Sequence, residues 1–139
     1  MKFYLAGRYQ DKETIGSFAK SLSKIGHEIT ATWMYESYDP NILQSQLSLQ
    51  ENRICGIKDL KEISECEELI FFSENEITPT PRNGRHVEFG YALALGKRIN
   101  IIGPRENIFH YLTQIHLYKT KDEFVEHLFV RSMYGNLLV

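Results

Sequence analysis

The chain has 139 residues, of which 42% are hydrophobic and 24% are charged, and its formal net charge is −2. This length and composition are typical of a globular domain, so we expect residues 1–139 to form a single domain. The charge excludes a general electrostatic attraction for a nucleic acid polymer, so any binding of nucleotides must come from a local site.

The predicted elements alternate between short apolar runs and longer amphipathic segments. In chain order, the pattern predicts a strand over 3–6, a helix over 13–25, a strand over 27–33, a helix over 47–66, a strand over 68–72, a helix over 84–97, strands over 98–103 and 115–118, and a helix over 121–131. Alternation of this kind with short connections indicates an α/β fold in which helices cover both faces of a five-stranded parallel sheet.

In such a sheet the ligand binds at the carboxyl ends of the strands. This rule gathers Gly7 and Arg8, the 73–84 loop with Glu88, and the 103–109 segment at one edge. Asp59, in the helix before the third strand, can face the same crevice.

One carboxylate is out of place on the helix predicted over 84–97. At helical spacing, Glu88 shares a face with small or apolar residues, namely Gly84, Tyr91, Ala92 and Leu95. An ionised carboxylate on an inward face, beside glycines that let a ligand approach, is what a covalent nucleophile needs. The alternative is that Glu88 caps the helix or pairs with a neighbouring cation.

Three further candidates have structural alternatives. Tyr4 lies inside a predicted strand, where core packing is an equally simple role. Asp59 sits among charged residues, as on a solvated helix face. Trp33 and the tyrosines near it either line a pocket for a flat ring or pack in the core.

Other signatures are weak or missing. Arg8 follows a strand-end glycine as at the start of a phosphate-binding turn, but no dinucleotide or nucleoside-triphosphate motif follows it. His86 and His110 are too poorly supported by other ligands to predict a metal site. Cys55 and Cys66 fit no zinc or redox spacing, which indicates reduced thiols. Because no signal peptide or membrane-spanning stretch is evident, we expect a cytoplasmic protein with no membrane partner.

Taken together and in order, these segments resemble the nucleoside 2-deoxyribosyltransferase family, which includes the 2'-deoxynucleoside 5'-monophosphate N-glycosidases. The resemblance covers nearly the whole chain. It rests on Tyr4-Leu5-Ala6-Gly7, Asp59-Leu60, Gly84-x-x-x-Glu88-x-Gly90-Tyr91-Ala92 followed by Gly96-Lys97, and Asn107-Ile108-Phe109. It implies a flavodoxin-like or Rossmann-like three-layer sandwich.

The resemblance also implies roles for individual residues. Glu88 matches the nucleophile that attacks C1' of the sugar, and Asp59 matches the acidic residue that handles the proton of the leaving base. Tyr4 matches a tyrosine that holds the nucleophile in place. Asn107 matches an asparagine that reaches into a neighbouring subunit's site. The last correspondence implies a homo-oligomer, from dimer to hexamer, with sites near subunit interfaces.

One position departs from the family. Six residues before the nucleophile, where the transferases carry an acidic residue and the monophosphate hydrolases a serine, this chain has Arg82. Asn83, Arg85 and Arg8 lie near it in the predicted fold. Arginines suit a 5'-phosphate through forked hydrogen bonds, but they are equally common as solvated loop charges. The phosphorylation state of the substrate therefore stays open.

The sequence thus predicts an enzyme that acts on a small-molecule nucleoside or nucleotide by a retaining mechanism, with no cofactor or metal. The catalytic residues are Glu88, Asp59 and Tyr4, and the substrate-binding residues are Gly7, Arg8, Trp33, Arg82, Asn83, Gly84, Arg85, Asn107 and Phe109. The alternatives are a hydrolase of 5'-monophosphates and, more distantly, a non-catalytic nucleotide-binding module.

Overall fold

The computed structural model describes residues 1–36, 48–74 and 83–135. Its strands are β1 (Lys2–Ala6), β2 (Glu28–Ile29), β3 (Glu68–Phe72), β4 (Arg98–Ile102) and β5 (Ile115–Tyr118). Its α-helices are α1 (Lys12–Lys24), α2 (Leu49–Glu65), α3 (Gly84–Ala94) and α4 (Lys121–Tyr134). Short 3-10 helices are η1 (Tyr9–Asp11), η2 (Trp33–Tyr35) and η4 (Ile108–Tyr111).

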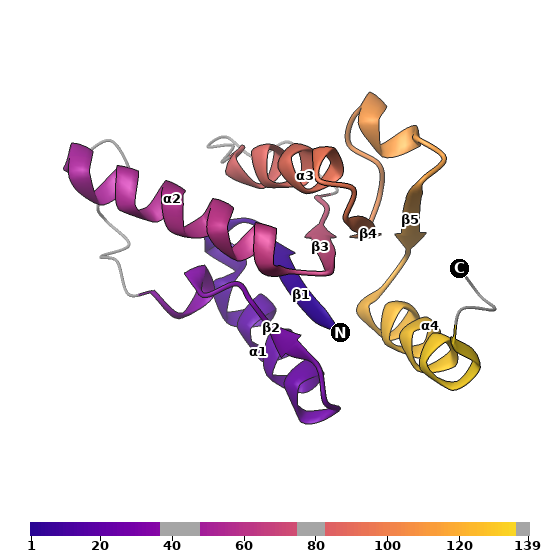
Figure 1. Cartoon of the computed structure of the whole chain (residues 1–139). Coiled ribbons are helices and arrows are strands. Elements are labelled where there is room, and N and C mark those ends of the chain that lie inside the picture. The colour runs from indigo at the N-terminus through magenta and orange to yellow at the C-terminus, as the bar shows by residue number, and fades with distance from the viewer. Residues whose placement is uncertain (37–47, 75–82, 136–139) are drawn as a thin grey trace.

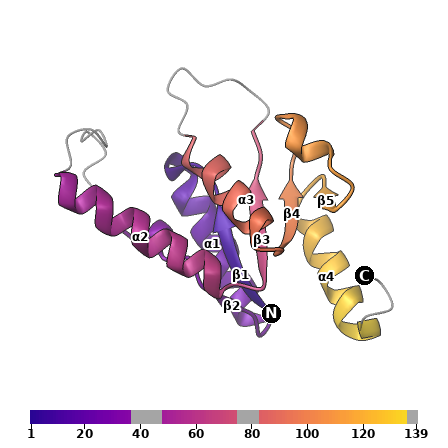
Figure 2. The ribbon, with the colours of Figure 1, turned by 45° about the horizontal axis from the view of Figure 1, so that its top comes forward.

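The five strands form one sheet in the order β2-β1-β3-β4-β5, and every pair in it is parallel. Helices α2 and α3 cover one face, and α1 and α4 lie on the other (Figure 1). Figure 2 shows the same three layers from a second direction. The predicted flavodoxin-like α/β fold is confirmed. The strand order reverses between β1 and β3, which is the point where sheets of this kind bind ligands.

The second strand is shorter than its sequence suggests, and the predicted strand over 27–33 is wrong beyond Ile29. The Thr30 amide still donates to Phe3 O at 2.8 Å, but the Thr30 hydroxyl donates to Glu62 O at 2.8 Å. The Thr32 hydroxyl donates to Glu62 Oε2 at 2.7 Å. The threonines that gave this segment its strand-like pattern therefore bond to helix α2, because local hydroxyl bonds compete with the sheet ladder.

The helix boundaries follow local capping. The predicted helix over 47–66 begins at Leu49, because the Ser48 hydroxyl accepts a hydrogen bond from the Glu51 amide at 3.0 Å. Residue 47 lies outside the described residues. Helix α3 ends at Ala94, shortly before Gly96, whose φ of +74° ends the turn at low steric cost.

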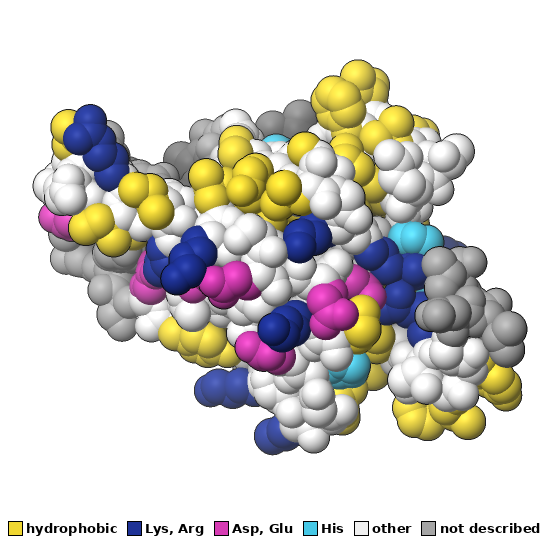
Figure 3. Space-filling view, in the orientation of Figure 1, with side chains coloured by type: hydrophobic (Ala, Val, Ile, Leu, Met, Phe, Trp, Pro, Cys, Tyr) yellow, Lys and Arg dark blue, Asp and Glu magenta, His cyan; other side chains and the backbone are white. Residues whose placement is uncertain are grey.

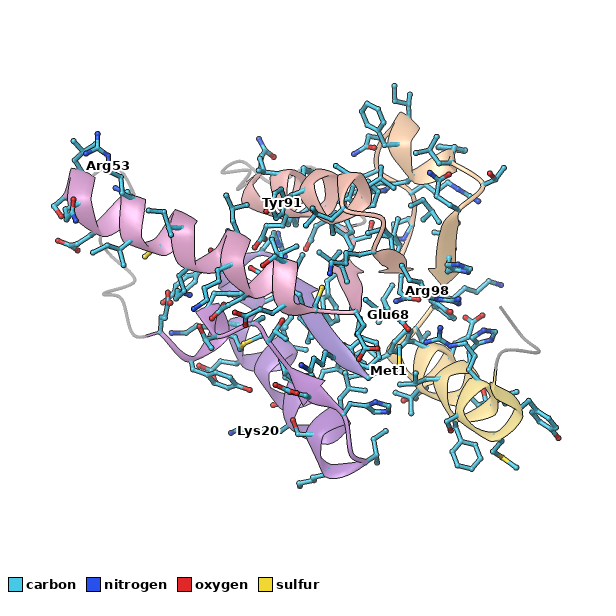
Figure 4. All side chains as sticks on the ribbon, viewed as in Figure 1. Met1, Lys20, Arg53, Glu68, Tyr91 and Arg98 are labelled. Atoms are coloured by element: carbon cyan, nitrogen blue, oxygen red, sulfur yellow. The ribbon has the colours of Figure 1, made fainter. Side chains whose placement is uncertain are left out.

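A buried ion pair fixes α4 against the start of the sheet. Glu68 at the start of β3 is 3% exposed and accepts hydrogen bonds from Arg131 at 2.9 and 3.0 Å. Asn100 on the next strand donates to it at 3.0 Å. Figure 4 shows Glu68 and Arg98 close to Met1, at the edge where the strands begin. This cluster is structural, since it lies at the opposite edge from the carboxyl ends of the strands.

No helix within the described ranges is both long enough and apolar enough to cross a membrane.

Gly103, directly after β4, should be intolerant of a side chain. Its φ is +117°, and a Cβ there would lie 3.1 Å from Ser73 Cβ and 3.3 Å from Ser73 O. We predict that Gly103→Ala lowers the free energy of unfolding by about 2 kcal/mol or more, measured by urea denaturation. Gly26→Ala is the matched control, because Gly26 has a φ of +98° but a Cβ there would meet no atom within 4 Å. Equal losses in the two variants would contradict a steric role for Ser73.

Candidate active site

The central feature of the candidate site is a tyrosine–carboxylate pair between the sheet and helix α3. Tyr4 on β1 is fully buried, and its hydroxyl donates a hydrogen bond to Glu88 Oε2. Phe3, the preceding residue, packs against Phe124 of α4 on the other face of the sheet. Because side chains alternate along a strand, Tyr4 faces α2 and α3. Glu88 sits one turn into α3 and points down onto this face.

Burial controls the protonation of the pair. Glu88 is partly exposed when the whole residue is considered, but its carboxyl group is buried. Burial raises the pKa of Glu88 to about 8, although the hydrogen bond from Tyr4 acts in the opposite direction. Burial and the nearby Glu88 charge raise the pKa of Tyr4, so its hydroxyl stays protonated and available as a donor.

Asp59 joins this pair from helix α2. Helices α2 and α3 pack side by side, and the Asp59 charge raises the pKa of both Glu88 and Tyr4. Burial also raises the pKa of Asp59 itself, against the opposing effect of the Lys58 ammonium. Both carboxyl groups are therefore harder to ionise than in water, Asp59 mainly through its own burial and Glu88 through burial and the charge of Asp59.

Lys58 is a member of this cluster that the sequence did not single out. Its Nζ lies 2.9 Å from Asp59 Oδ1 and 2.6 Å from Glu36 Oε1. Glu36 follows η2 and is separated from α2 in the chain, so local sequence patterns carry no signal for this contact.

Glu106 is the second residue that sequence reasoning missed. Its carboxylate accepts hydrogen bonds from Arg85 at 2.6 and 2.9 Å, from the Ser73 hydroxyl at 3.1 Å and from the Glu74 amide at 3.1 Å. These donors come from the loop after β3 and from the first turn of α3. Glu106 therefore ties together the loops at the carboxyl edge of the sheet. An acidic residue just after a Gly-Pro strand end was the available signal.

The arginines expected near a phosphate have different placements. Arg85 is 7% exposed and engages Glu106 with both terminal nitrogens. Arg8 Nε lies 3.0 Å from Asp11 Oδ2 and 2.7 Å from Glu74 Oε1. Arg82 lies outside the described residues. Arg8 and Arg85 are thus both paired with carboxylates of the protein itself.

Gly7 and Trp33 line the first strand's carboxyl end. A Cβ on Gly7 would lie 2.3 Å from Ile15 Cδ1, so the glycine lets α1 approach closely. The Trp33 indole is buried and donates to Leu5 O at 2.7 Å. In this structure both residues therefore take part in the packing around β1.

The remaining predicted residues lie at the ends of α3 and η4. Asn83 and Gly84 are exposed at the start of α3. Asn107 caps η4, its Oδ1 accepting from the Phe109 amide at 3.0 Å, and its Nδ2 lies 3.5 Å from His86 Nδ1. The Phe109 side chain is exposed. The structure thus joins Tyr4 to Glu88, with Asp59 near enough for its charge to act on both, while Asn107 is half-buried beside His86 and Phe109 is exposed.

Outside this cluster, the described residues form a surface hollow but no candidate metal site. Among the described residues, no group of three or more His, Cys, Asp or Glu side chains is arranged to hold a metal ion. An open hollow lies between α1 and α4, away from Tyr4 and Glu88. It is lined by Glu13, Thr14, Ser17, Phe18 and Lys121.

Solved structures that resemble this fold include those of two known enzymes. No protein-family model and no curated protein sequence matches the chain. The CMP N-glycosidase BcmB of Clostridium botulinum is 23% identical, with a TM-score of 0.60 over 94% of this chain and 99% of its own. A 2-deoxyribosyltransferase of Bacillus psychrosaccharolyticus is 18% identical, with a TM-score of 0.63 over 89% of this chain and 90% of its own. The chain therefore shares the fold of an N-glycosidase and of a 2-deoxyribosyltransferase, the two activities of the family that its sequence resembles.

The raised pKa of Glu88 has a consequence for stability. Its pKa is about 8 in the folded chain against an ordinary 4.5, so the folded state binds this proton more tightly than the unfolded state. The stability that results is fully present below about pH 4.5 and is lost as the pH rises through 8.

We predict that Glu88→Gln, which is neutral at every pH, raises the Tm at pH 8.5 by roughly 3–6 °C, equivalent to about 1 kcal/mol. The gain should shrink at pH 5. The measurement is a thermal melt at both values, with Glu65→Gln as the control because Glu65 is exposed on α2. A pH-independent effect of Glu88→Gln would contradict the burial of an ionisable carboxyl group.

Proposed function

We propose that this chain is an enzyme of the nucleoside 2-deoxyribosyltransferase family that cleaves or transfers the N-glycosidic bond of a nucleoside or nucleotide. The observation that carries the proposal is the contact of Tyr4 with Glu88, beside Asp59, where the strand order reverses. The shared fold with an N-glycosidase and a 2-deoxyribosyltransferase supports it.

In the proposed mechanism, Glu88 is the nucleophile. A carboxylate oxygen forms a bond to C1' of the sugar while the bond from C1' to the base nitrogen breaks, through a transition state with oxocarbenium character. The negative charge of Glu88 stabilises that cation before the covalent bond is complete. The product of this step is a glycosyl ester of Glu88 and a free base.

Asp59 is proposed to protonate the leaving base. A purine or pyrimidine leaves poorly as an anion, so a proton delivered to its nitrogen lowers the barrier. Burial raises the pKa of Asp59, which favours the protonated form required of an acid. Because burial also raises the pKa of Glu88 to about 8, the pair holds one proton near neutral pH, and the active form is the one in which Asp59 carries it and Glu88 is ionised. The ester is then resolved by a second base, which gives transfer, or by water, which gives hydrolysis.

An uncharged nucleoside is the substrate class that the described residues favour. Arg8 and Arg85 are each already paired with carboxylates of the chain, so neither offers a free guanidinium to a 5'-phosphate. The second candidate is a 5'-monophosphate N-glycosidase, favoured by the fold shared with a CMP N-glycosidase over nearly all of that protein. In that case a phosphate would have to recruit Arg82 or displace an existing ion pair.

The test is release of free base, followed by chromatography, from a panel of nucleosides and 5'-monophosphates with and without a second base. A transferase forms a new nucleoside when the acceptor base is present. A monophosphate N-glycosidase releases base and sugar phosphate without an acceptor. No turnover on any member of the panel, combined with tight ligand binding, would support the nucleotide-binding module and overturn the enzymatic proposal.

Variants should separate the two carboxylates. We predict that Glu88→Ala abolishes base release, whereas Asp59→Asn reduces it by about 10²- to 10⁴-fold, the usual worth of general acid catalysis.

The wild type should show a bell-shaped pH profile with its alkaline limb near pH 8, where the pair loses its last proton. Asp59→Asn should lose that limb, since only ionisation of Glu88 then matters. Full activity of Glu88→Ala would contradict the assignment of Glu88 as the nucleophile. Glu65→Ala, on the exposed side of α2, is the control.

We also propose that the chain forms a homo-oligomer through the outer sides of α2 and α3. Figure 3 shows apolar side chains gathered over these helices and η4. The exposed residues include Ile54, Ile57, Val87 and Leu95, and the Ile57 side chain is 69% exposed. Several exposed apolar side chains gathered on one face are typical of an interface. The same helices carry Asp59 and Glu88, so an interface here would lie near the site.

This interface predicts that Ile57→Glu lowers the molar mass measured by light scattering toward that of the 16.2 kDa monomer. A buried carboxylate facing its own copy across a symmetric contact is strongly unfavourable. Met133→Glu on α4, which is 62% exposed but on the other face of the sheet, should leave the mass unchanged. A wild-type protein that is monomeric at high concentration would refute the proposed association.

A further inference from the structure

Lys58 lies at the centre of a hydrogen-bonded cluster beside the candidate site. Its ammonium contacts Glu36 Oε1 at 2.6 Å, Asp59 Oδ1 at 2.9 Å and Thr32 Oγ1 at 3.2 Å. A fourth group, Glu62 Oε1, lies 3.7 Å away. Lys58 and Glu62 are on α2, whereas Thr32 and Glu36 belong to the segment after β2. The lysine therefore fastens that segment to the helix that carries Asp59.

The contact with Asp59 engages one oxygen of the carboxyl group. Lys58 bonds to Oδ1, and within the described residues no protein group donates to Oδ2. An ammonium held by Glu36 on one side and Asp59 on the other restricts the rotation of the Asp59 side chain. As far as the described residues go, Oδ2 is the oxygen that can contact a ligand.

Lys58 is also the cation that opposes a strongly negative environment. The groups that act on Asp59 are Glu36 after η2 and Lys58 and Glu62 on α2. The groups that act on Glu88 are Tyr4 on β1 and Asp59, Lys58 and Glu62 on α2. Glu36 and Glu62 raise the pKa of Asp59, and Lys58 lowers it. Lys58 also lowers the pKa of Glu88. Burial alone would lower the pKa of Lys58, but its contacts with Glu36 and Asp59 and the charge of Glu62 together raise it, so the ammonium stays charged at neutral pH.

We propose that Lys58 is a positioning residue that orients Asp59 and keeps the proton of the Asp59–Glu88 pair exchangeable near neutral pH. The acid–base role rests on the proposed function. Without the ammonium, both carboxyl groups would hold their protons more tightly, and Asp59 would be free to turn away from the leaving base. A cation this close to a carboxylate lowers its pKa by about 1 to 3.

The first test is an NMR titration of the Asp59 carboxyl carbon in ligand-free protein, which requires no turnover. In Lys58→Met we expect its midpoint to move upward by about one pH unit or more. Lys58→Arg keeps the charge and should restore a midpoint close to that of the wild type. Lys61→Met is the matched control, because Lys61 lies on the same helix, is 75% exposed and contacts only Glu65, at 3.9 Å, among the ion pairs of the described residues.

The second test is the pH profile of kcat/KM for base release. Lys58→Met should move both limbs of the bell toward higher pH, and a move of about one pH unit should lower the rate at the wild-type optimum by up to about tenfold. A structural role alone would lower the Tm and leave the limbs where they are, so thermal melts of every variant accompany the kinetics.

These outcomes separate the two proposals. An unchanged Asp59 midpoint in a folded Lys58→Met protein overturns the role of Lys58, while the proposed function still stands on wild-type base release. If the wild type releases no base, the proposed function fails, and the acid–base role of Lys58 fails with it even where the NMR midpoint moves. If Lys58→Met does not fold, an unchanged profile in Lys58→Gln overturns the proposal, because that variant also removes the charge.

Discussion

The hydrogen bond from Tyr4 to Glu88 links the middle of the sheet to the helix that covers it. Tyr4 is completely buried on β1, so its hydroxyl requires a partner, and Glu88 supplies one. In return the tyrosine holds the Glu88 carboxyl group at a fixed place near the carboxyl end of β1. The rest of the candidate site is arranged around this contact, with α2 contributing Asp59 from the same side of the sheet.

The carboxylates of this cluster are unfavourable for folding and favourable for chemistry. Burial raises the pKa of Glu88 and of Asp59, because a buried carboxyl group is more stable when neutral. A surface helix would place such groups in water. Here burial opposes the ionisation of both groups, and the Asp59 charge further opposes that of Glu88. Such groups are concentrated at functional sites for this reason.

A second network keeps the surrounding loops in place. Glu106 binds Arg85, Ser73 and the Glu74 amide, so it joins the loops after β3 and β4 to the first turn of α3. Arg8 extends the network to the loop after β1 through Glu74. These ion pairs explain how a chain with several arginines near its site can use them for architecture. Both Arg8 and Arg85 are thereby paired with carboxylates of the chain.

The sequence by itself determined the order of the main helices and strands, the parallel sheet and the inward position of Glu88. Helical and strand periodicity are local properties, so the order of elements and the inward side of Glu88 follow from residue spacing alone. Spacing failed at 27–33, where Thr30 and Thr32 bond to Glu62 of a distant helix. Only the tertiary structure decided the partners of the charged groups. Lys58 with Glu36 and Arg85 with Glu106 join segments that no local pattern relates, and their pairing depends on how helices and loops pack against the sheet.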